Sequence, residues 1–108
     1  LLTHDAPAGL RRNGIHPRPI WLTPEVEHYC WQQRIRLRDA VDATSPAWLF
    51  HGHWHYWVTE TLEGARPDGT DYLCEIRGLS NEGYTTNMVR VDLDPYVPGG
   101  ITDVTVLR

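Results

Sequence analysis

The chain has 108 residues, a formal net charge of −4 at pH 7, and 41% apolar residues. This length accommodates one small domain, which we place at residues 1–108. No apolar run approaches the roughly 18 residues that a membrane-spanning helix needs, and the negative charge gives no overall basic field for nucleic acid. The composition thus argues against a membrane helix and makes a nucleic-acid-binding module the least favoured function.

The start of the chain and its cysteines indicate the cellular compartment in which the protein works. No basic stretch followed by an apolar run stands at the start, so we expect a cytoplasmic protein. Cys30 and Cys74 are far apart in sequence and match neither a disulfide framework nor a Cys-x-x-Cys zinc site. We expect both to be small, buried core residues in a reducing compartment.

A strand, a loop and one helix are predicted first. Residues 1–3 are typical of the end of a buried strand, and the stretch 9–22, rich in Arg, Pro and Gly, favours an irregular surface loop. Thr23 can cap a helix and Pro24 suits its first position. The pattern predicts a helix that ends near Ala43, before Pro46. Its expected apolar face consists of Val26, Tyr29, Cys30, Leu37, Ala40 and Val41.

Strands are predicted for the rest of the chain. Residues 46–50 form a short apolar run that favours a buried strand, and period-two patterns follow at 56–62, 72–77, 89–93 and 102–107. The predicted fold class is α/β, with the order β-loop-α-β followed by about four mostly antiparallel strands. One helix would then cover a sheet of perhaps six strands. The chain also opens on an apolar stretch at Leu1, so we expect a C-terminal fragment whose missing N-terminal half, or a partner chain, covers the rest.

Three histidines lie within five residues, directly after the buried strand at 46–50. These are His51, His53 and His55, and Gly52 between them permits backbone angles that other residues resist. Ligand sites in α/β sheets gather at the carboxyl ends of strands, and neutral imidazole binds Zn, Mn, Fe and Ni. The cluster equally fits the edge of an aromatic core in which the histidine ring nitrogens form hydrogen bonds within the protein.

His4 favours the metal site. It too follows an apolar strand end, and a loop and helix connect the two strands. Such a crossover makes neighbouring strands parallel, so their carboxyl ends meet at one edge of the sheet. We therefore predict metal ligation by His4, His53 and His55.

These motifs resemble the C-terminal half of the calcineurin-like metallophosphoesterases. The resemblance lies in a lone His after a strand (His4), a connecting helix, and the Gly-His-x-His motif at 52–55, with similar closing strands after them. It implies a β-sandwich of two mixed sheets flanked by helices, and two divalent metal ions (Mn, Fe, Zn or Ni). His4 and His53 would bind one ion and His55 the other. Such a centre polarises a phosphoryl oxygen and holds a hydroxide for in-line attack on a phosphate mono- or diester.

Further roles follow from the same resemblance. Asp5 would accept a hydrogen bond from His4, or serve only as a turn residue. Three arginines would contact the phosphate of the substrate, or would be solvated charges of the loop: Arg11, Arg12 and Arg18. His16 and Trp54 would line the substrate cleft.

The sequence also departs from the family pattern. It contains no Asp-x-His, Gly-Asp or Gly-Asn-His motif, so it lacks the bridging carboxylate and the His that protonates the leaving group. Two divalent ions without a carboxylate between them repel strongly, so we expect this chain alone to be inactive or nearly so. Two alternatives remain: a small module that binds one transition metal, and an interaction domain whose strip of Trp54, Tyr56 and Trp57 packs on a partner.

Overall fold

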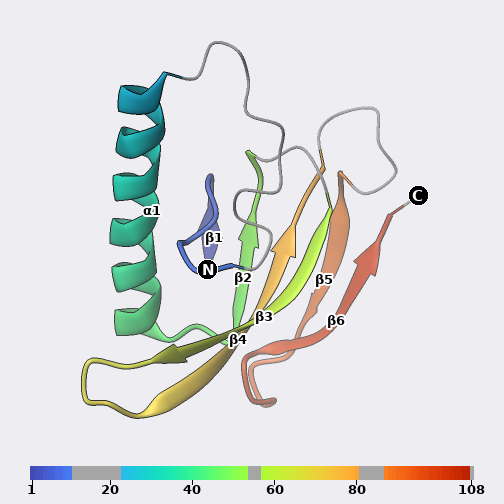
Figure 1. Ribbon diagram of the computed structural model, residues 1–108. Coiled ribbons are helices and arrows are strands. Elements are labelled where there is room, and N and C mark those ends of the chain that lie inside the picture. Colours follow the sequence, from blue (N-terminus) through green and yellow to red (C-terminus); the bar gives the residue numbers. More distant parts are fainter. Residues whose placement is uncertain (11–22, 54–56, 81–86, 108) are drawn as a thin grey trace.

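A computed structural model describes residues 1–10, 23–53, 57–80 and 87–107. It has one helix and two sheets (Figure 1). The elements are β1 (Leu2–Thr3), α1 (Pro24–Thr44), β2 (Trp48–His51), β3 (Val58–Ala65), β4 (Asp71–Gly78), β5 (Val89–Leu93) and β6 (Ile101–Val106). The predicted α/β class and the order of elements are confirmed. No helix in the described ranges is long and apolar enough to cross a membrane.

The main sheet is mixed and has the strand order β1-β2-β4-β3. β1 runs parallel to β2, with Leu2 opposite Phe50 and Thr3 opposite His51. β2 is also parallel to β4, while β3 and β4 form an antiparallel hairpin of eight paired residues on each strand. The crossover through α1 therefore places the carboxyl ends of β1 and β2 side by side.

Local sequence explains both ends of α1. The Thr23 side chain accepts a hydrogen bond from the backbone N–H of Val26 at 3.3 Å, and Pro24 occupies the first turn. At the other end Ser45 adopts a left-handed conformation (φ 40°), and its N–H donates to the carbonyl of Val41 at 2.7 Å. These bounds agree with the prediction to within one residue.

The predicted apolar face of α1 is wrong in its N-terminal half. Val41 is buried and Leu37 packs against the core, but Val26 and Tyr29 are exposed. The helix contacts the core through its C-terminal turns. Arg34 and Arg38 lie against the loop after β1, because that loop presents a carboxylate and a carbonyl to them.

The core lies between α1, the loop after β1 and the main sheet. It consists of Ala6, Leu10, Val41, Leu49, Leu62, Tyr72, Cys74 and Ile76. Burial raises the pKa of the Cys74 thiol to about 11, so this cysteine is an inert core residue as predicted. Cys30 is only partly buried.

The single sheet of perhaps six strands is a wrong prediction. Within the described ranges, β5 and β6 pair with each other and with no third strand, as a separate two-stranded antiparallel sheet. β4 is already hydrogen-bonded on both sides, by β2 and β3, so it offers no edge to the hairpin. The turn between β5 and β6 approaches β2 closely: a Cβ at Gly99 (φ 79°) would lie 2.8 Å from the Cβ of Ala47. Only glycine allows this contact.

Candidate metal-binding site

The register of β1 and β2 brings two distant histidines to one edge of the main sheet. Thr3 is opposite His51, and the backbone pairing continues one step further, where the Gly52 N–H donates to the His4 carbonyl at 3.2 Å. The two strands therefore end at the same level. His4 leaves the end of β1, and His53 follows the end of β2 after one intervening glycine.

The imidazoles of His4 and His53 are in direct contact. Nδ1 of His53 lies 3.0 Å from Nε2 of His4 across 49 positions of sequence. The ring centroids are 4.8 Å apart and the ring planes meet at 65°. Both residues are exposed, so an ion or ligand can reach them from solvent.

The separation of these nitrogens fits joint ligation of one ion. With metal–nitrogen bonds of about 2.1 Å, two ligand nitrogens lie about 3.0 Å apart at a right angle and about 3.4 Å apart at a tetrahedral angle. The observed 3.0 Å is the length of a hydrogen bond in which one ring nitrogen donates to the other, and it is also the spacing of neighbouring positions around an octahedral ion that would replace the shared proton. Each neutral imidazole has one lone pair to give. Two such donors make half a site, and the described part of the chain contains no group of three or more His, Cys, Asp and Glu able to hold a metal.

Several predicted site residues lie outside the described residues. They include the third predicted metal ligand and the predicted substrate contacts: His55, Trp54, Arg11, Arg12, Arg18 and His16. Tyr56 of the alternative interaction strip lies there too.

Asp5 lies in the loop that carries His4 and helps to anchor it. Its carboxylate accepts from the Ala6 N–H at 2.7 Å, and Arg34 Nε of α1 lies 3.5 Å from the other carboxylate oxygen. The Ala8 N–H donates to the Arg34 carbonyl at 3.1 Å, and the side chain of Pro7, which precedes Ala8 in the loop, is fully buried. This loop is thus attached to α1 on one side and to β2 on the other, which holds the backbone of His4 in place.

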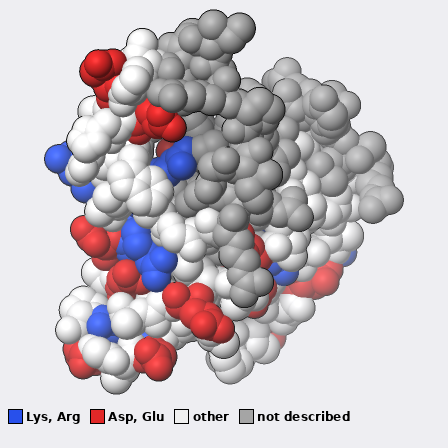
Figure 2. Space-filling model, in the orientation of Figure 1, with Lys and Arg blue, Asp and Glu red and all other residues white. Residues whose placement is uncertain are grey.

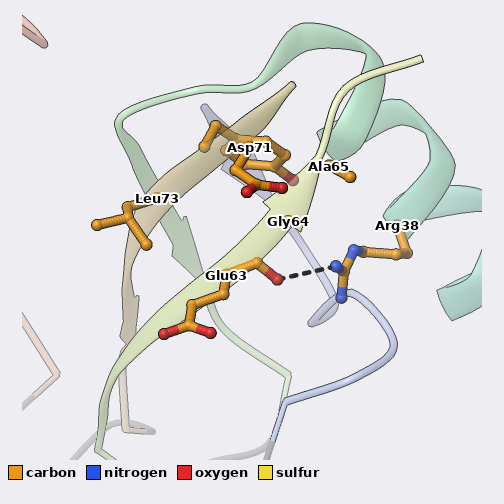
Figure 3. A pocket seen from close by; sticks show the side chains of 7 residues that line it. Arg38, Glu63, Gly64, Ala65, Asp71 and Leu73 are labelled. Atoms are coloured by element: carbon orange, nitrogen blue, oxygen red, sulfur yellow. Dashed lines mark hydrogen bonds between the residues drawn. The ribbon is translucent and has the colours of Figure 1, made fainter. Parts of the chain in front are cut away.

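Arg38 makes a second connection between α1, this loop and the β3–β4 hairpin. Its guanidinium donates to the Asp42 carboxylate at 3.0 Å and to the Ala8 carbonyl at 3.1 Å. It also donates to the Glu63 carbonyl at 3.2 Å (Figure 3). Asp42 also accepts from the Tyr72 hydroxyl at 2.5 Å. Arg38, Glu63 and Tyr72 line an open pocket here. Because the Arg38 donors serve the fold, this pocket offers little to an anionic ligand.

The Tyr72 hydroxyl predicts how stability changes with pH. Burial, and next the hydrogen bond to Asp42, raise its pKa well above the ordinary value near 10. Above pH 10 the unfolded chain releases this proton while the folded protein retains it, so the free energy of unfolding should fall as pH rises. Tyr72→Phe should remove that part of the fall. Urea unfolding between pH 8 and 11 tests this; equal pH slopes for the two proteins would contradict it.

His51 belongs to the predicted histidine cluster but was given no role as a ligand, and it lies next to the His4–His53 pair. It is 3% exposed, and burial lowers its pKa, which keeps the ring neutral. One sequence feature could have indicated this: His51 is two positions after the fully buried Leu49, so it shares a face of β2 with it.

Charged side chains give no sign of a nucleic-acid interface on the face in Figure 2. Over the described residues, acidic and basic groups are interspersed along α1 and the β3–β4 hairpin. Arg38–Asp42 and Arg77–Glu75 are ion pairs among the described residues.

Comparisons with known proteins were made at three levels. The chain matches no protein-family model, no curated protein and no solved structure. What can be said of its function therefore depends on its own residues: two exposed imidazoles from adjacent parallel strands, 3.0 Å apart and held by an anchored loop and a glycine turn.

Proposed function

We propose that this chain contributes part of the metal centre of a metal-dependent phosphoesterase. His4 and His53 would bind one divalent ion, and His55 would bind a second. The observation that carries the proposal is the 3.0 Å separation of two ring nitrogens that come from different strands. The resemblance of the His4 and Gly-His-x-His motifs to the calcineurin-like metallophosphoesterases supports the reaction class.

The chain's own part in this chemistry is to hold and orient ligands. When bound, two divalent ions would polarise the phosphoryl oxygen and lower the pKa of a water for attack on a phosphate ester. His4 and His53 supply neutral nitrogen donors on a rigid strand end, which limits the motion of the ion that they hold. Arg11 and Arg12 are the proposed phosphate contacts, since a guanidinium binds phosphate oxygens in pairs.

The remaining ligands must come from another segment or chain. The sequence lacks the Asp-x-His, Gly-Asp and Gly-Asn-His motifs that provide the carboxylate bridge in the family. The edge of the main sheet at β1 also supports a missing part: among the described strands β1 pairs with β2 alone, and Leu2 on it is 80% exposed. An unpaired apolar edge of this kind favours pairing with a further strand. We propose that the same partner supplies this strand and the missing carboxylates.

Calorimetric titration of the chain with Zn²⁺ and Mn²⁺ tests the metal site. We expect weak binding that His4→Ala abolishes, because two imidazoles make an incomplete site. The control is His28→Ala, which removes an exposed imidazole from α1. Absence of binding, or binding that survives His4→Ala, would contradict the proposal. Tight binding of one equivalent would instead identify a dedicated single-metal module.

A further inference from the structure

A histidine outside the proposed ligand set lies directly behind the His4–His53 pair. Nδ1 of His51 is 3.0 Å from the carbonyl oxygen of Gly52. A carbonyl oxygen only accepts, so Nδ1 carries the proton and donates it. The neutral ring then has its lone pair on Nε2, and that atom is buried with no hydrogen-bond partner in the part of the chain that the structure describes.

The acceptor of this bond belongs to the peptide that leads into His53. His53 has a left-handed backbone (φ 64°), which a residue with a β-carbon adopts only when its surroundings hold it there. The Gly52 N–H is bound to the His4 carbonyl, and the Gly52 carbonyl is bound to the His51 ring. Both peptide planes beside Gly52 are therefore fixed, and His53 is turned towards His4.

The end of β4 provides the space for the His51 ring. Gly78 is paired with His51 in the sheet, and a Cβ at Gly78 would lie 2.8 Å from Cε1 of that ring and 2.9 Å from the Cβ of Val58. Contacts this short exclude any side chain at position 78. The absence of that side chain allows the imidazole to lie over β4, where its Nδ1–H reaches the Gly52 carbonyl.

We propose that His51 is a positioning residue that holds the strained Gly52–His53 turn, and with it the metal-binding geometry of the His4–His53 pair. The expected effect on metal binding rests on the proposed function, whereas the role of His51 in the turn rests on the observed hydrogen bonds alone. His51 gains little for the fold itself, because its buried Nε2 has no hydrogen-bond partner among the described residues and an unpaired buried polar atom destabilises.

Two substitutions separate the hydrogen bond from the bulk of the side chain. His51→Leu fills the site with apolar atoms and removes the donor, whereas His51→Asn places an amide N–H near the position of Nδ1. We expect His51→Leu to weaken Zn²⁺ binding about tenfold, the size typical of a lost partner behind a metal ligand. We expect His51→Asn to stay within about twofold of the unsubstituted chain. The melting temperature of His51→Leu should not fall, which shows that the effect is not unfolding.

A measurement without metal makes the test independent of the proposed function. Proton–nitrogen correlation spectra of the imidazoles, with ring-to-ring nuclear Overhauser effects, report the His4–His53 contact directly. We expect the contact in the unsubstituted chain and in His51→Asn, and its loss in His51→Leu. Persistence of the contact in His51→Leu would overturn the inference. If the unsubstituted chain keeps the contact but binds no Zn²⁺, the proposed function fails while the role of His51 in the turn stands.

Discussion

On the proposed function, His53→Ala is expected to abolish metal-dependent hydrolysis of a phosphate ester by this chain together with the partner that supplies the missing ligands. The substitution removes one of the two nitrogens that lie 3.0 Å apart and leaves a single imidazole for the ion. Loss of a partner behind a ligand already weakens metal affinity 10- to 100-fold, so loss of the ligand itself should lower kcat/KM by at least about 100-fold.

The assay compares hydrolysis of a simple aryl phosphate across a range of metal concentrations. His28→Ala is the matched control, because it removes an exposed histidine from α1 and should leave the rate unchanged. Turnover of His53→Ala at the level of the unsubstituted enzyme would refute ligation by this residue. A rate restored only by high metal concentration would instead show that affinity, not chemistry, was lost.

Leu49→Ala is expected to have the largest effect on stability. Leu49 lies in the middle of β2 and is fully buried within the core cluster. Truncating a buried leucine removes apolar burial and leaves a cavity, which together destabilise by about 3 kcal/mol. In a domain of this size that corresponds to a fall in melting temperature on the order of 10 °C or more.

Leu73→Ala provides the control for this experiment. It makes the same chemical change on β4, but its side chain is 64% exposed, so the stability should change by less than about 0.5 kcal/mol. Thermal unfolding followed by circular dichroism measures both. Equal losses in the two variants would contradict the assignment of the core. Since β2 also carries His51 and leads to His53, Leu49→Ala should weaken metal binding as well.

The helix shows how far local sequence reasoning extends. Thr23, Pro24 and Ser45 act on their own neighbours in the chain, and the bounds of α1 were predicted to within one residue. The N-terminal half of its buried face was not, because burial depends on which parts of the protein the helix contacts. Val41 meets the sheet, whereas Val26 and Tyr29 lie beyond the part of α1 that packs on the core.

The candidate site also has a part that the sequence predicted and a part that only tertiary contacts decided. Spacing and residue type pointed to His4 and His53, since a strand-loop-helix-strand crossover brings strand ends together by a general rule of chain connection. The role of His51 was not predictable. It depends on the absence of a side chain at Gly78, a residue 27 positions away that is placed beside it only by the pairing of β2 with β4.

The sequence by itself determined the helix and its caps, the alternating strands, and the histidines that end two of those strands, because each of these follows from interactions between near neighbours. Only the tertiary structure decided that the strands divide into sheets of four and two, that Arg34 and Arg38 attach the first loop to the helix, and that the rings of His4 and His53 touch. These features depend on strand register and close packing. A shift of one residue in the β1–β2 pairing would reverse the faces of every side chain involved.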